Sequence, residues 1–249
     1  MRVFAKEESG SPVKSTVVEL STSDGLPFLR TRSLLFVLLA AELAMACAYV
    51  ATSILETPET VMRLFSLDGE RNVGSWFSAT QLFATGLVLI TISLLAKGDR
   101  WPKNGLFLAA GLAFVFLSAD EALAIHESIT GFANRHAKWL VLFPGNHGAW
   151  IPIYLTLGIA VLGLTWRSVL LMLQEHPKQT AQGMTGAILI LVGAVGVEVA
   201  GYFTLFSSPV AQVTIEELLE MFGASLILIS CVELLLKLVR VVPLDFLER

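Results

Sequence analysis

Charged side chains are scarce in this sequence. Only 15% of its 249 residues are Asp, Glu, Lys or Arg, against about 25% in an average soluble protein. Hydrophobic residues make up 55% of the chain, and its mean hydropathy is +0.71. This balance excludes a disordered chain and an ordinary soluble enzyme, and it predicts an integral membrane protein.

Cysteine is also rare. Cys47 and Cys231 both lie inside apolar runs, which excludes a disulfide scaffold and indicates two buried thiols. The formal net charge of −4 gives no sign of a nucleic-acid partner. No phosphate-binding loop or dinucleotide-binding glycine motif occurs in a usable context, so no nucleotide is expected. Only one histidine falls within the apolar runs, which argues against a haem.

Long apolar runs are what the sequence has instead. Each is long enough to cross about 30 Å of hydrocarbon as a helix, and lipid requires helices because it cannot hydrogen-bond free backbone groups. The sequence therefore predicts an all-α integral membrane bundle of six transmembrane helices. The runs cover residues 32–55, 75–96, 105–128, 149–173, 182–206 and 213–239.

The distribution of basic residues predicts the orientation. Most of the 17 Lys and Arg residues flank one end of the runs, which the positive-inside rule assigns to the cytoplasm. We therefore expect an inner (plasma) membrane protein with both termini in the cytoplasm. The predicted parts are a mobile tail over residues 1–30, the transmembrane domain over 31–240 and a short tail over 241–249.

The predicted outer loops contain further helical signals. Thr57 and Pro58 are typical of a helix start, and residues 132–143 read as a second interfacial segment. Three tryptophans fit an outer aromatic belt, namely Trp76, Trp139 and Trp150.

Acidic residues gather in one layer of the predicted bundle. Asp120 lies about 22 Å along the third run, and the opposite direction of the sixth run brings Glu217 to a similar depth. Glu198 in the fifth run joins them. An ionised acid at a helix centre costs roughly 2.5–3.5 kcal/mol, so several together need compensation. The candidates are a bound metal, shared protons, a partner chain, or the outer cations Arg71, Arg135 and Lys138.

Carboxylates with an imidazole are ligands that suit Zn²⁺, Fe²⁺ or Mn²⁺. The expected metal ligands are Asp120, Glu121, His126, Glu198 and Glu217. Glu127 or Glu220 would then act as the general base on a bound water.

Other acids in the runs have plainer interpretations. Glu216 is expected to face lipid headgroups, and Glu233 to pair with Lys237 four residues on. Glu42 lies in the middle of the first run, with no partner that the sequence identifies.

Four stretches resemble a family of uncharacterised bacterial multi-pass membrane proteins. They are LDGERNVGSWF (67–77), LSADEALAIHE (117–127), residues 195–201 and TIEELLE (214–220). The resemblance implies a six-span bundle with DE…HE and EE…E signatures, and it adds Glu70 and Asn72 to the residues of interest. Residues 106–120 are also similar to the Ser-Asp segment of YhhN-like lysoplasmalogenases.

Three function classes follow from these patterns. The first is a metal-dependent hydrolase that acts on a membrane lipid at the outer leaflet. The second is a proton- or cation-coupled transporter or channel. The third is a non-catalytic subunit whose acids pair with a partner membrane protein or a second copy of the chain.

Overall fold

A computed structural model describes residues 31–55, 57–69, 71–96, 105–141, 143 and 147–241. The predicted tails lie outside the described residues, except for Val241, which ends the last helix. The helices are α1 (Thr31–Ile54), α2 (Glu59–Phe65), α3 (Val73–Leu95), α4 (Leu106–Leu123), α5 (Ile125–His136), η1 (Lys138–Leu140), α6 (Trp150–Glu175), α7 (Pro177–Leu191), η3 (Val192–Val197), α8 (Glu198–Tyr202) and α9 (Pro209–Val241).

Six helices in this fold are long and apolar enough to cross a membrane. Five are α1, α3, α4, α6 and α9, and the remaining span is the continuous helix Pro177–Tyr202, which comprises α7, η3 and α8. The predicted six-span, all-α fold is confirmed, and the described residues contain no β-strand beyond one isolated bridge. The chain is a multi-pass membrane protein.

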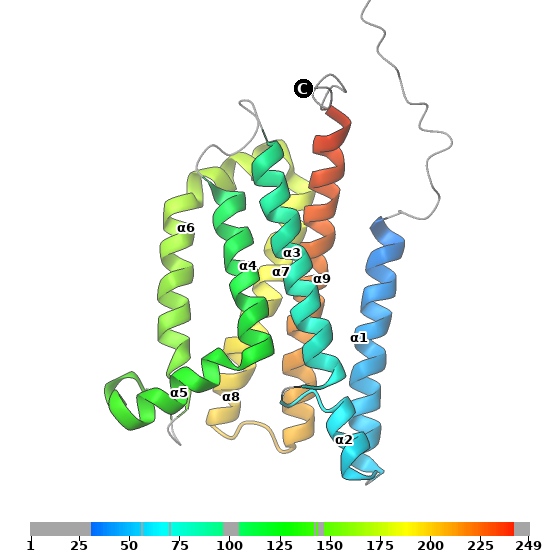
Figure 1. The fold of residues 1–249 in the computed structure, drawn as a ribbon, viewed down its shortest axis with the longest axis vertical. Coiled ribbons are helices and arrows are strands. Elements are labelled where there is room, and N and C mark those ends of the chain that lie inside the picture. Colours follow the sequence, from blue (N-terminus) through cyan, green and yellow to red (C-terminus); the bar gives the residue numbers. More distant parts are fainter. Residues whose placement is uncertain are drawn as a thin grey trace, which may run out of the picture. The chain divides into compact units, whose positions relative to one another are not determined.

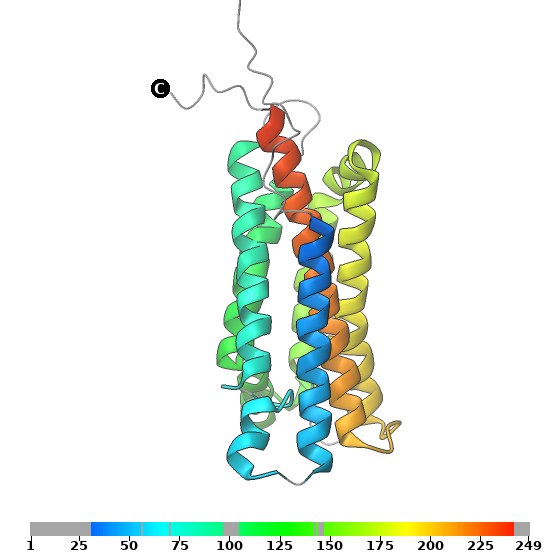
Figure 2. The ribbon, with the colours of Figure 1, turned by 90° about the vertical axis from the view of Figure 1, so that its right-hand side faces the viewer.

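The span α9 is the centre of the bundle. Half of its apolar window is buried, against 17–28% for the other spans. It packs against α1, α3 and α7, and Figure 2 shows α1 running beside it.

Glycine pairs set the closest helix contacts. A Cβ on Gly186 of α7 would lie 2.4 Å from the backbone oxygen of Gly223 on α9, so no larger residue fits there. Gly86 and Gly111 approach in the same way between α3 and α4. Small residues at such crossings allow backbones to come together and gain van der Waals contact in lipid.

The third predicted run is not one helix, which corrects its expected end at residue 128. The span α4 stops at Leu123, Ala124 adopts a left-handed conformation with φ 48°, and α5 begins at Ile125. In Figure 1, α5 runs across the spans rather than along them, at the same end of the bundle as α2. We call this the α2–α5 end.

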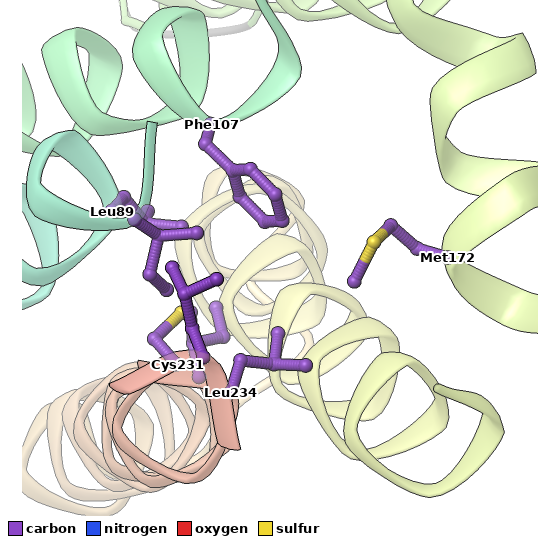
Figure 3. Packing of buried hydrophobic residues seen from close by; sticks show 8 residues of the cluster. Leu89, Phe107, Met172, Cys231 and Leu234 are labelled. Carbon is purple, nitrogen blue, oxygen red and sulfur yellow. The ribbon is translucent and has the colours of Figure 1, made fainter. Parts of the chain in front are cut away.

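The other half of the bundle is filled with apolar side chains. Figure 3 shows Leu89, Phe107, Met172, Cys231 and Leu234 meeting between α3, α4, α6 and α9. Leu89, Phe107 and Met172 are 3–6% exposed, so this cluster is a buried apolar core. We call it the apolar seal.

A polar clamp joins three spans at the depth of the apolar seal, where its residues Glu233 and Lys237 are next to Leu234 and Leu238 of the seal on α9. Glu233 accepts hydrogen bonds from Thr31 Oγ1 at 2.9 Å and Gln179 Nε2 at 2.8 Å. Lys237 Nζ donates to Gln179 Oε1 at 2.8 Å. Glu233 and Lys237, which were expected to pair, are thus linked through the Gln179 side chain, which contacts both of them.

The first predicted outer helical segment is present, whereas residues 132–143 contain only the end of α5, at His136, and the short η1. The first begins at Glu59, with Pro58 at the position before it, and Thr57 Oγ1 donates to the Thr52 carbonyl. Trp76 and Trp139 are 68% and 78% exposed, as a lipid-facing belt requires. Trp150 is only 8% exposed, so its assignment to the belt is wrong.

Candidate functional site

A cavity of about 470 Å³ lies within the α2–α5 half of the bundle. Its walls come from α3, α4, α5, α6, α7, η3, α8 and α9, together with the segment before α3. Eight of the lining side chains are acidic, namely Asp68, Asp120, Glu121, Glu127, Glu198, Glu216, Glu217 and Glu220.

The structure brings every predicted site residue to this cavity. The five expected metal ligands and the two expected bases all line it, although they come from four different helices. Among the residues of interest from the resemblance, Glu70 lies outside the described residues, and Asn72 instead caps α3 by accepting a hydrogen bond from the Ser75 N–H at 2.8 Å. The roles assigned to the seven residues stay predictions.

The break at Ala124 positions His126. Asp120 lies in the last turn of α4, and its Oδ1 accepts a hydrogen bond from the His126 backbone N–H at 2.7 Å. Asp120 Oδ2 lies 3.3 Å from His126 Nδ1. The length of the third apolar run predicts His126 and Glu127 on that span, but both lie on α5 and line the cavity from there.

The surroundings of His126 favour its protonated form. Burial lowers the pKa of the imidazole, but its hydrogen bond to Asp120 and the negative charge of nearby carboxylates outweigh burial. The net effect raises the pKa of His126 above its ordinary value. Across the cavity wall, its ring meets Trp150 edge to face, with centroids 5.7 Å apart.

A wide helical turn positions Glu198. Residues Val192–Val197 form a π-helical turn inside the fifth span, and Glu198 follows directly. Such turns insert one extra residue into a helix and often occur at functional sites. The hydroxyl of Tyr202, one turn further, donates to Glu198 Oε1.

Close helix contact holds the acids of α9 against this turn. A Cβ on Gly193 would lie 2.8 Å from the Glu216 backbone oxygen and 2.9 Å from Glu220 Cγ. Glu216 and Glu220 are four residues apart and share one face of α9. Glu216 therefore lines the cavity, and its assignment to lipid headgroups is wrong.

Three further cavity residues have little signal in the sequence. Asp68 enters from the segment before α3, and its only signal was its place in the LDGERN stretch. Trp150 and Tyr154 form an aromatic wall with ring centroids 5.3 Å apart. Both lie on one face of α6. The only acidic residue of this span is Glu175 at its end, so no charge in the sequence indicates that the start of α6 lines a site.

Apart from the imidazole of His126, the described lining of the cavity offers no side chain that could carry a positive charge. Its lining residues include no Lys or Arg within the described part of the chain. The three outer cations proposed as counter-ions, Arg71, Arg135 and Lys138, are all exposed and do not line it.

The acids are also not arranged as a metal cage. Among the residues that the structure describes, no three His, Cys, Asp or Glu side chains form a group that could hold a metal ion. The five expected ligands therefore share a cavity without forming such a group.

The geometry thus defines a multi-pass membrane protein with an acidic cavity at one end of a six-span bundle. The chain belongs to the family described as Domain of unknown function (DUF8692), whose model matches residues 31–234. This range includes all six spans almost completely and every residue of the cavity. No curated protein and no solved structure matches the chain.

Proposed function

We propose that the protein is a membrane carrier that binds a cation in the acidic cavity. One observation supports this above all: eight acidic side chains line a single cavity whose described lining holds no Lys or Arg. Charges of one sign in a low-dielectric site repel one another, and a bound cation removes that repulsion.

The cavity suits a small organic cation. Its volume of about 470 Å³ falls within the roughly 300–1,000 Å³ of small-molecule sites, far more than one metal ion fills. Trp150, Tyr154 and Tyr202 add aromatic faces, which attract alkylammonium groups. Carboxylates and aromatic rings together favour an amine or a quaternary ammonium compound.

The closed half of the bundle fits a carrier better than an open channel. The apolar seal follows the cavity along α9, because Ile227 of the seal comes one turn after Ala224 of the cavity lining, so a cation that enters at the α2–α5 end meets a barrier. Carriers of this kind expose their site to one side at a time, by moving parts of the bundle against each other.

The proposed orientation places the cavity on the extracytoplasmic side of the plasma membrane, with both termini in the cytoplasm. Glu59 begins α2 and Lys178 is the second residue of α7, and these two helix starts lie at opposite ends of the bundle in Figure 1, so the two exposed residues provide labelling sites. In Glu59→Cys, a membrane-impermeant thiol reagent added to intact cells should react. In Lys178→Cys, it should react only after permeabilisation, and the reverse pattern would overturn the orientation.

Binding can be tested on purified protein by ligand-dependent thermal stabilisation, because a ligand that binds the folded state raises Tm. Putrescine and tetramethylammonium should raise Tm, and butanol, a neutral molecule of similar size, should not. Glu217→Gln removes a cavity charge and should weaken binding about tenfold, equivalent to about 1.4 kcal/mol.

The matched control is Glu59→Gln, which removes an exposed acid paired with Arg63 outside the cavity. It should bind like the wild type. Counterflow of radiolabelled putrescine in proteoliposomes then tests transport itself. Binding without counterflow would leave a cation receptor rather than a carrier.

A metal-dependent hydrolase is the second candidate. The pairing of His126 Nδ1 with Asp120 favours it, because metal-binding imidazoles are usually fixed by a carboxylate in this way. This hypothesis expects a stoichiometric divalent metal that is lost in His126→Ala and in Glu217→Ala. Elemental analysis that finds such a metal, together with no stabilisation by amines, would replace the carrier with the hydrolase.

A further inference from the structure

Three spans meet at a second polar site, behind the wall of the acidic cavity. Glu42 from the middle of α1, Gln81 from α3 and Ser225 from α9 are all less than 5% exposed. Gln81 Nε2 lies 2.8 Å from Glu42 Oε1, and Ser225 Oγ lies 2.6 Å from the same carboxylate oxygen. Gln81 Nε2 and Ser225 Oγ are 2.6 Å apart.

Together, these three residues have fewer hydrogen-bond donors than their buried acceptor atoms need. The two amide protons of Gln81 are directed to Glu42 and Ser225, and the hydroxyl proton of Ser225 is directed to Glu42. Glu42 Oε2 and Gln81 Oε1 are buried and have no hydrogen-bond partner among the described residues. Both unpaired atoms are acceptors, so one added proton would supply what the site lacks.

The alternative orientation of the Gln81 amide leads to the same conclusion. Turning the amide over places its oxygen 2.8 Å from Glu42 Oε1, where the nitrogen otherwise lies. Two acceptors at that separation repel each other unless a proton joins them. Only the carboxyl of Glu42 can carry that proton, because a neutral amide and the single Ser225 hydroxyl have none to spare.

Among the described residues of the three spans that form the site, none carries a positive charge close enough to balance an ionised Glu42. The span α3 contains no titratable side chain at all. On α1, Arg32 is ten residues away, which is about 15 Å along the helix, and on α9 the first basic residue after Ser225 is Lys237, about 18 Å along. Lys237 already donates to Gln179. The other titratable groups of α1 and α9 near this depth are Cys47, Tyr49, Glu217, Glu220 and Cys231, none of which is cationic.

The spacing also excludes a metal ion among Glu42 Oε1, Gln81 Nε2 and Ser225 Oγ. Oxygen ligands stand about 2.3–2.6 Å from an ion such as Ca²⁺ and therefore lie roughly 3 Å or more from one another. The three heteroatoms here are 2.6–2.8 Å apart, in direct hydrogen-bond contact. No space is left between them for an ion.

We propose that Glu42, Gln81 and Ser225 form a proton-binding site in the middle of the membrane, in which the Glu42 carboxyl carries the proton. The site is adjacent to the acidic cavity, because Ala224, next to Ser225, and Ser78, one turn from Gln81, both line that cavity. It does not depend on the function proposed for the cavity.

Infrared difference spectroscopy tests the proposal, since a neutral carboxyl has a carbonyl band well separated from the two bands of a carboxylate. We expect the neutral-pH spectrum of the wild type minus that of Glu42→Gln to show one lost neutral-carboxyl band. That band should shift in deuterated buffer. Loss of carboxylate bands instead would overturn the proposal. The matched control is Glu233→Gln, whose two carboxylate oxygens each accept a hydrogen bond, and it should leave the neutral band in place.

A second variant keeps the test valid if Glu42→Gln does not fold. Ser225→Ala retains Glu42 but removes one hydrogen bond to its Oε1. The neutral band should keep its intensity and move to higher frequency, because hydrogen bonds weaken the carbonyl bond they involve. A spectrum with no neutral band that responds to this substitution would overturn the proposal.

Discussion

Asp120 Oδ1 accepts a hydrogen bond from the backbone N–H of His126 at 2.7 Å, across the left-handed residue that separates α4 from α5. The other oxygen of the same carboxyl lies 3.3 Å from His126 Nδ1. One side chain therefore holds both the start of α5 and the imidazole that faces the cavity.

Removing that carboxyl should loosen the start of α5. Asp120→Ala eliminates an acceptor of an otherwise unpaired helix-terminal N–H, and we expect a loss of about 1 kcal/mol of stability. Asp120→Asn keeps an oxygen in the same position and should lose much less. Thermal unfolding in detergent compares the two, and equal losses would contradict the capping role.

The raised pKa of His126 predicts a pH dependence of stability. A group whose pKa is higher in the folded state stabilises that state fully below its unfolded pKa of about 6.5. The contribution is lost as the pH rises through the folded pKa. The difference in Tm between wild type and His126→Gln should therefore be largest at acidic pH and shrink as the pH rises. The measurement is made with a chelator present, and a difference that grows with pH would contradict it.

Ala124 should be improved by glycine. Its φ of 48° is unfavourable for a residue with a Cβ, whereas glycine adopts it freely. We expect Ala124→Gly to stabilise the protein by about 1 kcal/mol. The control is Ala122→Gly on exposed, regular helix two residues earlier, which should destabilise by roughly 0.5–1 kcal/mol. Losses at both positions would show that the break at Ala124 does not persist.

The contact between α7 and α9 should not tolerate a larger residue at Gly186. In Gly186→Ala the new methyl group meets the backbone of Gly223, which cannot rotate away, and overpacking of this kind costs about 1–3 kcal/mol. Gly196 is the matched control in the same span, because its nearest neighbour would be 3.8 Å from a Cβ. We expect a lower Tm for Gly186→Ala alone.

Hydropathy alone was sufficient to predict the six spans, because about 20 apolar residues in lipid have few alternatives to a helix. The helix rise per residue and the direction of each span also predict Asp120, Glu198 and Glu217 at one depth in the membrane, and all three line the cavity. The depth of a residue in the membrane can thus be estimated without knowing any side-chain contact.

Features that depend on side-chain bonding could not be predicted in this way. Alanine is a strong helix former, so nothing at Ala124 indicates a break, which depends on Asp120 reaching past it. The partners of Glu42 are also hidden from the sequence, since Gln81 and Ser225 are 39 and 183 residues away. Glu216 was misplaced because an acid near a helix start has a common surface role.

The π-helical turn at Val192–Val197 has a consequence for the whole end of the fifth span. It holds one residue more than a regular turn, and each residue of an α-helix rotates the chain by about 100°. Deleting a single residue there would swing Glu198 and Tyr202 away from the other acids, although every amino acid of the site would still be present. Chain length within this short stretch is thus as much a determinant of the site as the identity of its carboxylates.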